Sequence, residues 1–551
     1  MKTQLDRLYE HEKNRPDEVW FTQPMGGGKV RDITFKEAMD EARRMAAHLR
    51  TLDLPAKSKI ALFSKNTAWW MLADVAIWMA GHVTIPLYPT LTPETIGQIL
   101  DHSESKAIFI GKLDGYEAME PGIPDGLTRI ALPLAPKAVD APQWAKIIAD
   151  TDPIEGSPTR DPDDLATIIY TSGSTGVPKG AMHSFRTMCS AQGFIDGLGM
   201  TKDERMLSYL PLAHSFERQL VETTTFLIGF HVYFAESLDT FVKDLQRAQP
   251  TFFISVPRLW QKFQSGVFAK MPPSKLELML KIPIIRNIVR KKVLEGLGLS
   301  HVRFAGSGSA PIPAELISWY RSLGVELLEG YGMTENSSYS HMSQPGKVRV
   351  GYVGNTHADV ECKLSEDGEI LVKSPGTMLG YYKAEDLTKE MIDDEGFLHT
   401  GDLGEIDGEG RLKITGRVKE LFKTSKGKYV APAPIENRLL LSEHVELACV
   451  TGADQPQPFG MVVLSEQAMA KIREPQEKDR IGEALKSHLA QTNAGLDHHE
   501  QLHKLVVITD PWTVENGMLT PTLKLRRASI EKKYRDQVED WYGEKDKIIW
   551  N

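Results

Sequence analysis

The sequence predicts an α/β protein, and three observations support this fold class. The first two-thirds alternate helix-like stretches with short apolar runs that contain β-branched residues, a pattern typical of α/β layers with largely buried sheets. From about residue 355, strand-like segments are joined at Asp-Gly, as in "VECKLSEDGEILVKS", which predicts a small β-rich subdomain. After "TGRVKELF" the α/β pattern returns and continues to the end.

The elements follow from their periodicity. Residues 35–49 place five apolar side chains on one helical face, namely Met39, Ala42, Met45, Ala46 and Leu49. Residues 68–81, "AWWMLADVAIWMAG", carry three tryptophans and predict a buried helix. Strands are predicted at "KIALFS", "VTIPLY", "KAIFIG", "FHVYFA", "TFFISV", "HVRFAG" and "VELLEG". "GEIDGEGRLKIT" predicts a second hairpin, and the change in pattern places a domain boundary near residue 416.

Composition excludes several classes of protein. The 551 residues suffice for two to four domains, and 41% hydrophobic with 25% charged residues is ordinary for a soluble enzyme. A net charge of -9 argues against a general nucleic-acid binder. Three scattered cysteines, Cys189, Cys362 and Cys449, suggest neither a disulfide framework nor a thiolate metal site. The first residues are polar and lack a signal-peptide core. Together with the scattered cysteines, this leads us to expect a cytoplasmic protein.

One short stretch carries most of the chemical information. "YTSGSTGVPKG", residues 170–180, contains three glycines, four serine or threonine side chains and Lys179, and the stretch directly follows an apolar run. Such a loop offers amide and hydroxyl donors for which phosphate is the natural external partner. Neither G-x-x-x-x-G-K-[ST] nor G-x-G-x-x-G matches it. A phosphate-binding loop of another fold is therefore expected, with a plain surface loop as the alternative.

Four further stretches add to this loop: "LEGYGMTENS", "HTGDLGEID", "GRVKELFKTSKGKY" and "NGMLTPTLKLRR". Their order and spacing resemble the adenylate-forming superfamily, which includes acyl-CoA synthetases, the adenylation domains of peptide synthetases, and luciferases. The resemblance covers nearly the whole chain. "YLPLAHSFER", "SVPRLWQKF" and "GKYVAPAPIEN" look most like long-chain fatty acyl-CoA synthetases. This likeness implies an AMP-forming ligase that uses ATP, Mg2+ and coenzyme A.

The resemblance also implies roles for individual residues. The loop of residues 171–179 would wrap the ATP phosphates, with Thr171 and Glu335 around the Mg2+. Asp402 would accept hydrogen bonds from the ribose hydroxyls and Arg417 would lie near the ribose and phosphates. The implied catalytic residues are Lys524, Glu335, Thr171 and His214. The implied nucleotide- and coenzyme-binding residues are Thr171, Ser172, Gly173, Ser174, Thr175, Gly176, Lys179, Gly306, Ser307, Gly308, Glu329, Gly330, Tyr331, Gly332, Thr334, Asp402, Arg417, Lys419, Gly427 and Lys524.

Two active-site arrangements are implied in the same way. Lys524 would bridge the substrate carboxylate and AMP oxygens in the first, and the "KTSKGKY" loop with Gly427 would approach coenzyme A in the second. Lys419 matches the hinge position between them. The implied fold is a large N-terminal domain of layered α/β subdomains, residues 1–415, with its β-rich subdomain at about 350–415. A hinge at 416–419 and a small mobile α+β C-terminal lid domain, residues 420–551, complete it.

Two weaker signals point elsewhere. "HEQLH", residues 499–503, formally matches the H-E-x-x-H zinc motif but is followed by the strand-like "KLVVIT", so we do not expect zinc. Residues 276–299, "LELMLKIPIIRNIVRKKVLEGLGL", are apolar with basic residues on one side. They predict either a membrane-surface helix, and hence peripheral contact with the inner face of a membrane, or a helix packed on the domain with a solvated basic face; we favour the packed helix.

Two rival functions stay open. A fatty acyl-AMP ligase would perform the first step but deliver the acyl group to a carrier-protein pantetheine. A catalytically silent relative would only bind acyl ligands and nucleotide, although the presence of Lys179, Glu335, Asp402 and Lys524 argues against it. For His214 the alternative is a packing role.

Overall fold

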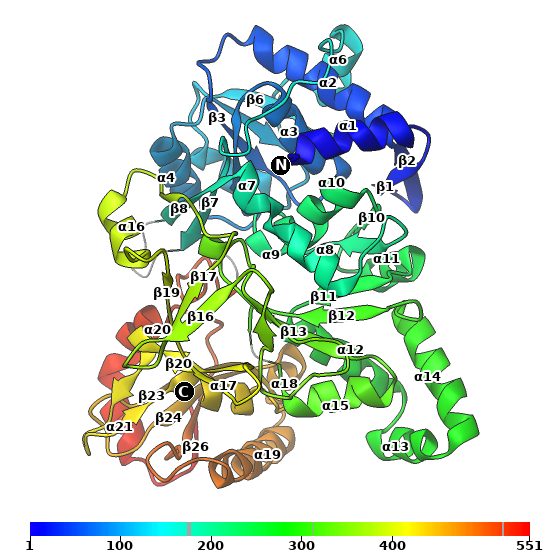
Figure 1. Ribbon diagram of the computed structural model, residues 1–551. Coiled ribbons are helices and arrows are strands. Elements are labelled where there is room, and N and C mark those ends of the chain that lie inside the picture. The colour runs from blue at the N-terminus through cyan, green and yellow to red at the C-terminus, as the bar shows by residue number, and fades with distance from the viewer. Residues whose placement is uncertain (173–177, 311, 521–522) are drawn as a thin grey trace. The chain divides into compact units, whose positions relative to one another are not determined.

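A computed structural model describes residues 1–172, 178–310, 312–520 and 523–551. The chain divides into two compact units. The first contains Met1–Ala310, Ala314–Cys362 and Leu371–His399, and the second is formed mainly by Lys363–Ile370 and Thr400–Asn551. Figure 1 labels many of their elements.

The largest sheet of the first unit has seven strands in the order β18-β8-β7-β4-β3-β5-β6. Strands β3 to β7 are parallel, whereas at one edge β8 is antiparallel to β7 and β18 is antiparallel to β8. The strands are β3 (Lys59–Phe63), β4 (Val83–Leu87), β5 (Ala107–Ile110), β6 (Thr128–Ala131), β7 (Leu165–Ser172), β8 (Pro178–Ser184) and β18 (Gly380–Tyr381). The apolar runs predicted a largely buried sheet, and the structure shows that this one is mostly parallel.

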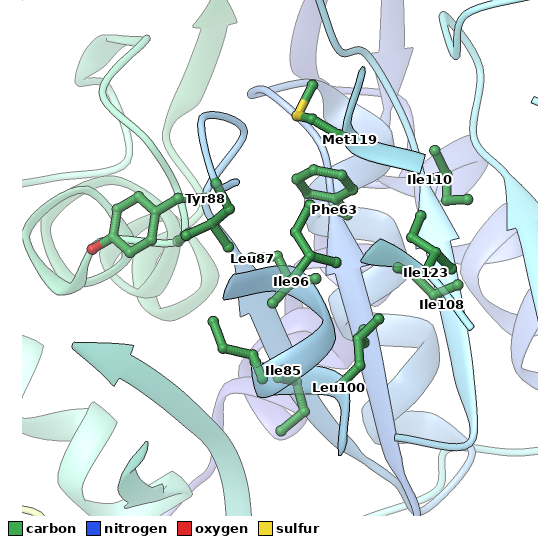
Figure 2. Close-up of a cluster of buried hydrophobic side chains, with 14 of the residues drawn as sticks. Phe63, Ile85, Leu87, Tyr88, Ile96, Leu100, Ile108, Ile110, Met119 and Ile123 are labelled. Carbon is green, nitrogen blue, oxygen red and sulfur yellow. The ribbon is translucent and has the colours of Figure 1, made fainter. Parts of the chain in front are cut away.

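In two helices the apolar residues predicted from the sequence are buried in the core. α2 (Phe35–Thr51) begins with a capping box in which Thr34 and Glu37 exchange hydrogen bonds. Its five predicted core residues, listed above, are all fully buried. All twelve residues of α3 (Ala68–Met79) are buried, as the three tryptophans predicted. Figure 2 shows the core on the sheet itself, where Phe63, Ile85 and Ile108 from three strands meet Ile96 and Leu100 of α4 (Pro93–Ser103).

The first unit has two further sheets. One has the order β2-β1-β10-β9, with β1 (Val19–Gly26), β2 (Lys29–Thr34), β9 (Arg205–Ser208) and β10 (His231–Phe234). The other has the order β11-β12-β13-β14-β15, with β11 (Phe252–Ser255), β12 (Phe304–Ser307), β13 (Leu327–Tyr331), β14 (His341–Met342) and β15 (Asn355–Thr356). Strands β11, β12 and β13 are parallel. Their carboxyl ends therefore lie at one edge, where open α/β sheets bind ligands.

The remaining helices of the first unit surround these sheets. Those used below are α9 (Ser215–Glu217), α11 (Phe241–Ala248), α12 (Pro257–Lys270), α13 (Pro273–Lys281), α14 (Pro283–Leu297) and α15 (Ala314–Ser322). The others include α1 (Gln4–Asn14), α6 (Trp144–Asp150), α8 (Gln192–Leu198), α10 (Thr224–Ile228) and α16 (Glu385–Met391). Within the described residues, no helix combines the length and apolar character needed to cross a membrane.

The predicted β-rich region is a four-stranded sheet with the order β16-β17-β19-β20. Its strands are β16 (Glu361–Leu364), β17 (Glu369–Lys373), β19 (Leu398–Ile406) and β20 (Leu412–Arg417). Both predicted hairpins are present, with the Asp-Gly turns at 367–368 and 407–408 between their strands. The chain passes between the two compact units within β16, β17 and β19.

The second unit contains an α+β layer with the strand order β23-β24-β25-β26. The strands are β23 (Val445–Thr451), β24 (Phe459–Leu464), β25 (Leu505–Ile508) and β26 (Ile548–Trp550). Alternate residues of β24 and β25 enter two separate cores. One core is covered by α17 (Pro432–Leu439) and α19 (Pro475–Ala494), and the other by α20 (Arg527–Tyr534) and α21 (Val538–Gly543). This agrees with the predicted α+β C-terminal part.

Candidate active site

The predicted phosphate loop joins two paired strands. β7 and β8 are antiparallel, and Thr171 lies opposite Lys179 in their register. The predicted residues Gly173, Ser174, Thr175 and Gly176 lie outside the described residues, and Ser172 is the last residue of β7. The hairpin therefore places Thr171 and Lys179 together at the two ends of the loop.

A tyrosine connects Lys179 with Glu335. The Lys179 ammonium lies 5.5 Å from the centre of the Tyr381 ring, which is within cation–π range. The Tyr381 hydroxyl donates a 2.7 Å hydrogen bond to Oε1 of Glu335. Strand β18 brings Tyr381 there because it pairs with β8, with Tyr381 opposite Ala181. Burial raises the pKa of Tyr381 far above its usual value, so the phenol stays protonated and donates.

Sequence reasoning missed Tyr381. It stands in "MLGYYKAE", where no loop, charge or spacing pattern marks it as a site residue. Its partner Glu335 is only 7% exposed, and the Glu335 carbonyl accepts a 2.7 Å hydrogen bond from the Met378 amide. Two segments far apart in sequence thus hold this carboxylate.

Glu335 lies in a tight turn that requires glycine nearby. A Cβ on Gly332 would lie 2.5 Å from the backbone carbonyl carbon of Ser338, so only glycine fits. Ser337 and Ser338 both have left-handed backbone, with φ of 55° and 57°. The Thr334 carbonyl accepts a 2.9 Å hydrogen bond from Nε2 of His183. Burial lowers the pKa of His183 to about 4, so this histidine acts as a neutral donor.

The other first-unit residues lie at the ends of β12 and β13. Ser307 is paired with Glu329 in the parallel register, and Gly306 with Leu328. The Ser307 hydroxyl is buried and has no hydrogen-bond partner among the described residues, so it is a donor that a bound ligand could satisfy. Gly330 and Tyr331 follow on β13 and pair with β14. A Cβ on Gly308 would lie 3.2 Å from the Phe216 ring.

His214 has a structural contact that the sequence did not reveal. It is the N-cap residue of α9, and its Nδ1 accepts a 3.1 Å hydrogen bond from the Phe216 amide. Its ring meets the edge of Tyr88, with ring centres 6.3 Å apart. The side chain is half-buried. The cap is consistent with the packing alternative, and the catalytic role stays a prediction.

Within the second unit, Asp402 and Arg417 form a pair. They lie opposite each other on β19 and β20, and Nε of Arg417 lies 2.8 Å from Oδ1 of Asp402. The Asp402 side chain is 9% exposed and the Arg417 side chain 53%. Gly401 before Asp402 has a φ of +70°, and its amide donates to Glu369. The register thus puts a carboxylate and a guanidinium side by side, where they form a charge-assisted contact.

Three other predicted residues lie in this unit. Lys419 is in the short 3-10 helix Val418–Glu420, directly after β20. Gly427 has a φ of +77° in the turn between Phe422–Lys423 and Tyr429–Val430, where other residues are strained. Two hydrogen bonds to Thr520 hold the backbone of Lys524: its carbonyl accepts from the Thr520 amide at 2.8 Å and its amide donates to the Thr520 hydroxyl at 3.0 Å.

The H-E-x-x-H stretch has no helix to align its histidines. The His503 ring stacks on Tyr542 with centres 4.7 Å apart, and its amide donates to the Pro458 carbonyl. The metal-site geometry that this motif needs on a helix is therefore not formed by residues 499–503.

Comparison with known proteins agrees with these features. Residues 8–382 match the model of an AMP-binding enzyme, and residues 420–546 match the AMP-binding enzyme C-terminal domain. The chain is 29% identical to long-chain-fatty-acid–CoA ligase FadD15 of Mycobacterium tuberculosis, over 97% of this chain and 96% of the relative. It is 30% identical to long-chain-fatty-acid–CoA ligase 6 of Mus musculus, over 93% and 82% of the two chains.

Solved structures share the fold. The adenylation domain of a carboxylate reductase from Mycobacterium chelonae superposes with a TM-score of 0.80 at 23% identity, covering 98% of this chain and 91% of that chain. The anthranilate CoA ligase AuaEII, in complex with anthranoyl-AMP, gives a TM-score of 0.77 at 20% identity, covering 98% of both chains. Because the family models together span most of the sequence, the chain belongs to the AMP-binding enzyme family.

Proposed function

We propose that this enzyme is a long-chain-fatty-acid–CoA ligase. It activates a long-chain fatty acid with ATP, giving acyl-AMP and pyrophosphate, and then transfers the acyl group to coenzyme A with release of AMP. The observation that carries the proposal is that relatives with this printed name match 97% and 93% of the chain. The Lys179–Tyr381–Glu335 contacts and the Asp402–Arg417 pair support it, because they bring together charged groups that could contact phosphate, Mg2+ and ribose.

Adenylation brings two anions together, so charge neutralisation and positioning dominate. We propose that the loop from Thr171 to Lys179 holds the β- and γ-phosphates. Thr171 and Glu335 would hold the Mg2+ of magnesium-ATP. The residues fit this ion, since Tyr381 occupies one oxygen of a buried carboxylate and Mg2+ needs only one or two protein oxygens besides phosphate and water. When bound, the ion neutralises phosphate charge.

We propose that further residues of the chain hold the nucleotide and acyl groups. Gly306, Ser307 and Gly308 with residues 329–334 would surround the adenine and reacting centre, where the buried Ser307 hydroxyl has a donor to offer. Asp402 would accept from the ribose hydroxyls, and Arg417 would lie near the ribose and phosphates. Lys524 would contact the reacting oxygens during adenylation, and His214 would border the acyl pocket.

Thioester formation would use a second arrangement of the same chain. We propose that residues 1–415 and 420–551 are the two moving domains and that residues 416–419 are the hinge, with Lys419 absorbing the backbone change. Gly427, whose left-handed backbone favours glycine, would lie close to coenzyme A. The proposed location is cytoplasmic with peripheral contact to the inner face of a membrane, because long-chain fatty acids partition into lipid.

The test is a panel of straight-chain carboxylates from two to about twenty carbons with ATP, Mg2+ and coenzyme A, read as AMP and pyrophosphate. We expect activity to rise with length and to be best at about ten to eighteen carbons, since each buried CH2 contributes about 0.8 kcal/mol until the pocket ends. Formation of ADP, or best turnover of acetate or an amino acid, contradicts the proposal. Full turnover with a carrier-protein pantetheine but none with coenzyme A favours the fatty acyl-AMP ligase instead.

A further inference from the structure

Three consecutive helices of the first unit carry a charge opposite to that of the chain. Residues 257–297, which form α12, α13 and α14, contain nine basic and two acidic residues, a net charge of +7, whereas the whole chain has a net charge of -9. Such a concentration of one sign creates a local field that attracts anionic surfaces.

One side of the α13–α14 hairpin is packed on the unit. Leu276, Val289 and Leu297 are buried. The Arg290 Nε donates a 2.7 Å hydrogen bond to the Ser322 carbonyl at the end of α15, and Gln246 of α11 donates to the Gly296 carbonyl at 2.9 Å. The packed helix favoured from the sequence is therefore present on this side.

The other side is apolar and exposed. Leu278 is 63% exposed, Ile282 42%, Ile284 78% and Ile288 55%. Four of the sixteen exposed large hydrophobic residues in the described part of the chain thus fall within eleven residues. They lie in the second half of α13, in the residue between the helices and in the first half of α14. Figure 1 shows these two helices beyond α12 and α15 of the same unit. The clustering separates this corner from the scattered apolar side chains that any surface carries.

Exposed lysines border this apolar corner. Lys275 and Lys281 flank it on α13, and Lys291 and Lys292 follow on α14. Ile284 and Ile288 are four residues apart and share a helix face with Lys291. Long lysine side chains can reach lipid phosphates while neighbouring apolar side chains enter the acyl boundary.

We infer that this corner, Leu278 to Ile288 with its four bordering lysines, docks the enzyme on an anionic lipid bilayer. The combination of apolar tips and a basic border matches an interface with acyl chains below and phosphates around it. A second copy of the chain fits less well, because a two-fold contact would bring like-charged helices together.

The docked corner is directly connected to the candidate site. α12 starts two residues after β11 ends, and the Trp260 indole donates a 3.2 Å hydrogen bond to the Gly306 carbonyl of β12. A bilayer bound at α13 and α14 would therefore present its fatty acids one helix away from the strand that carries Gly306 and Ser307. Substrate delivery rests on the proposed function, whereas membrane docking itself does not.

The experiment is flotation of the full chain with vesicles of phosphatidylcholine alone and of phosphatidylcholine with about one-third phosphatidylglycerol. We expect binding to the anionic vesicles that weakens with salt. The variant I284S/I288S and the variant K281E/K291E should each reduce the bound fraction, the lysine variant by at least about fivefold per charge. Matched controls are L238S, at an apolar residue of the first unit that is 93% exposed, and K146E, at an exposed lysine on α6.

Each outcome of these experiments either supports or overturns the membrane inference. If the parent does not float with anionic vesicles, or if the corner variants float like the controls, the inference is overturned. If the corner variants change only the oligomeric state in sedimentation, the corner is a contact between copies and the membrane inference is wrong. Flotation needs no turnover, so it is independent of the ligase assay with a soluble carboxylate. A chain that floats but forms no acyl-AMP would refute the proposed function and leave the docking surface standing.

Discussion

The hydroxyl of Tyr381 donates a 2.7 Å hydrogen bond to Glu335, 46 residues away in sequence, while the same ring faces the ammonium of Lys179. Tyr381 therefore contacts both Lys179, which is predicted to lie at the phosphates, and Glu335, which is predicted to lie at the Mg2+. Its protonated phenol donates to one oxygen of the carboxylate and so restricts the orientation of the Glu335 side chain. In the proposed reaction Tyr381 would therefore position Glu335.

Tyr381→Phe removes this donor and keeps the ring. We expect adenylation to slow by about 10- to 100-fold, because one hydrogen bond to a charged group contributes about 1.5–3 kcal/mol, and the Mg2+ concentration for half-maximal rate to rise. The measurement is pyrophosphate exchange across a Mg2+ series, with thermal unfolding alongside. The control is Tyr382→Phe, which removes a 3.2 Å bond to the exposed Glu104. Equal Mg2+ dependence in both variants would mean that Tyr381 does not position Glu335.

Asp402→Asn tests the proposed ribose contact. The substitution keeps the size of the side chain but loses the charge beside Arg417. We expect ATP binding to weaken by about 1.5–3 kcal/mol. The free energy of unfolding should fall by less, because an ion pair with one half-exposed partner contributes about 1 kcal/mol or less to stability. Calorimetry of ATP binding and urea unfolding measure the two effects. Glu405→Gln, which breaks an exposed pair with Lys413 on the same hairpin, serves as the control, and unchanged ATP affinity in D402N would exclude the ribose role.

The parts of the fold that were predictable are those encoded within a short stretch. The buried face of α2, the wholly buried α3 and both Asp-Gly hairpins follow from periodicity or turn residues in adjacent positions. The contact of Tyr381 with Glu335 depends on β18 pairing with β8 across about two hundred residues, and no local pattern encodes it. The same limit applies to α14. The sequence predicts an apolar helix with basic residues on one side, but only the packing of this helix on the unit determines that Ile284 and Ile288 are exposed.

Glu217 should make stability depend on pH. It is completely buried and follows His214 by three residues, and burial raises its pKa from 4.5 to about 8. Its Oε1 accepts from the Ser208 hydroxyl at 2.8 Å and from the Tyr209 amide at 3.0 Å. The folded state therefore retains a proton that the unfolded state releases. The stabilisation is fully present below the unfolded pKa of 4.5 and is lost as pH rises towards about 8.

Glu217→Gln should remove this dependence, because glutamine is neutral at every pH and its carbonyl can accept the same two hydrogen bonds. We expect the stability of the variant relative to the parent to increase between pH 5.5 and 8, by up to about 1.4 kcal/mol per pH unit. Urea unfolding at a series of pH values measures it. The surface substitution Glu117→Gln is the control, and a constant difference between E217Q and the parent across this range would show that Glu217 is ionised in the folded protein.

Lys524→Ala should separate the two half-reactions. The backbone of Lys524 is held by its hydrogen bonds to Thr520, so loss of the side chain should leave the fold intact. We expect acyl-AMP formation to fall by about 10²–10³, the usual effect of removing one oriented donor at a developing charge. Conversion of supplied acyl-AMP and coenzyme A to thioester should continue. The control is Lys532→Ala, at an exposed lysine of α20. Equal loss of both steps in K524A would assign Lys524 a general role in the site.

Lys419→Pro tests the proposed hinge. Lys419 lies in the turn in which the Leu421 amide donates to the Arg417 carbonyl. Proline fixes φ near −65° and also restricts the preceding residue, so one of the two proposed arrangements should be trapped. If that is the adenylation arrangement, acyl-AMP accumulates and thioester formation fails; if it is the other, pyrophosphate exchange fails and supplied acyl-AMP is still consumed. Pyrophosphate exchange and turnover of purified acyl-AMP measure the two steps separately.

Lys419→Ala, which loses the side chain but keeps backbone freedom, should retain both steps. Since the trapped hinge must act on one step selectively, a folded K419P variant with both rates like those of K419A would rule out Lys419 as the hinge.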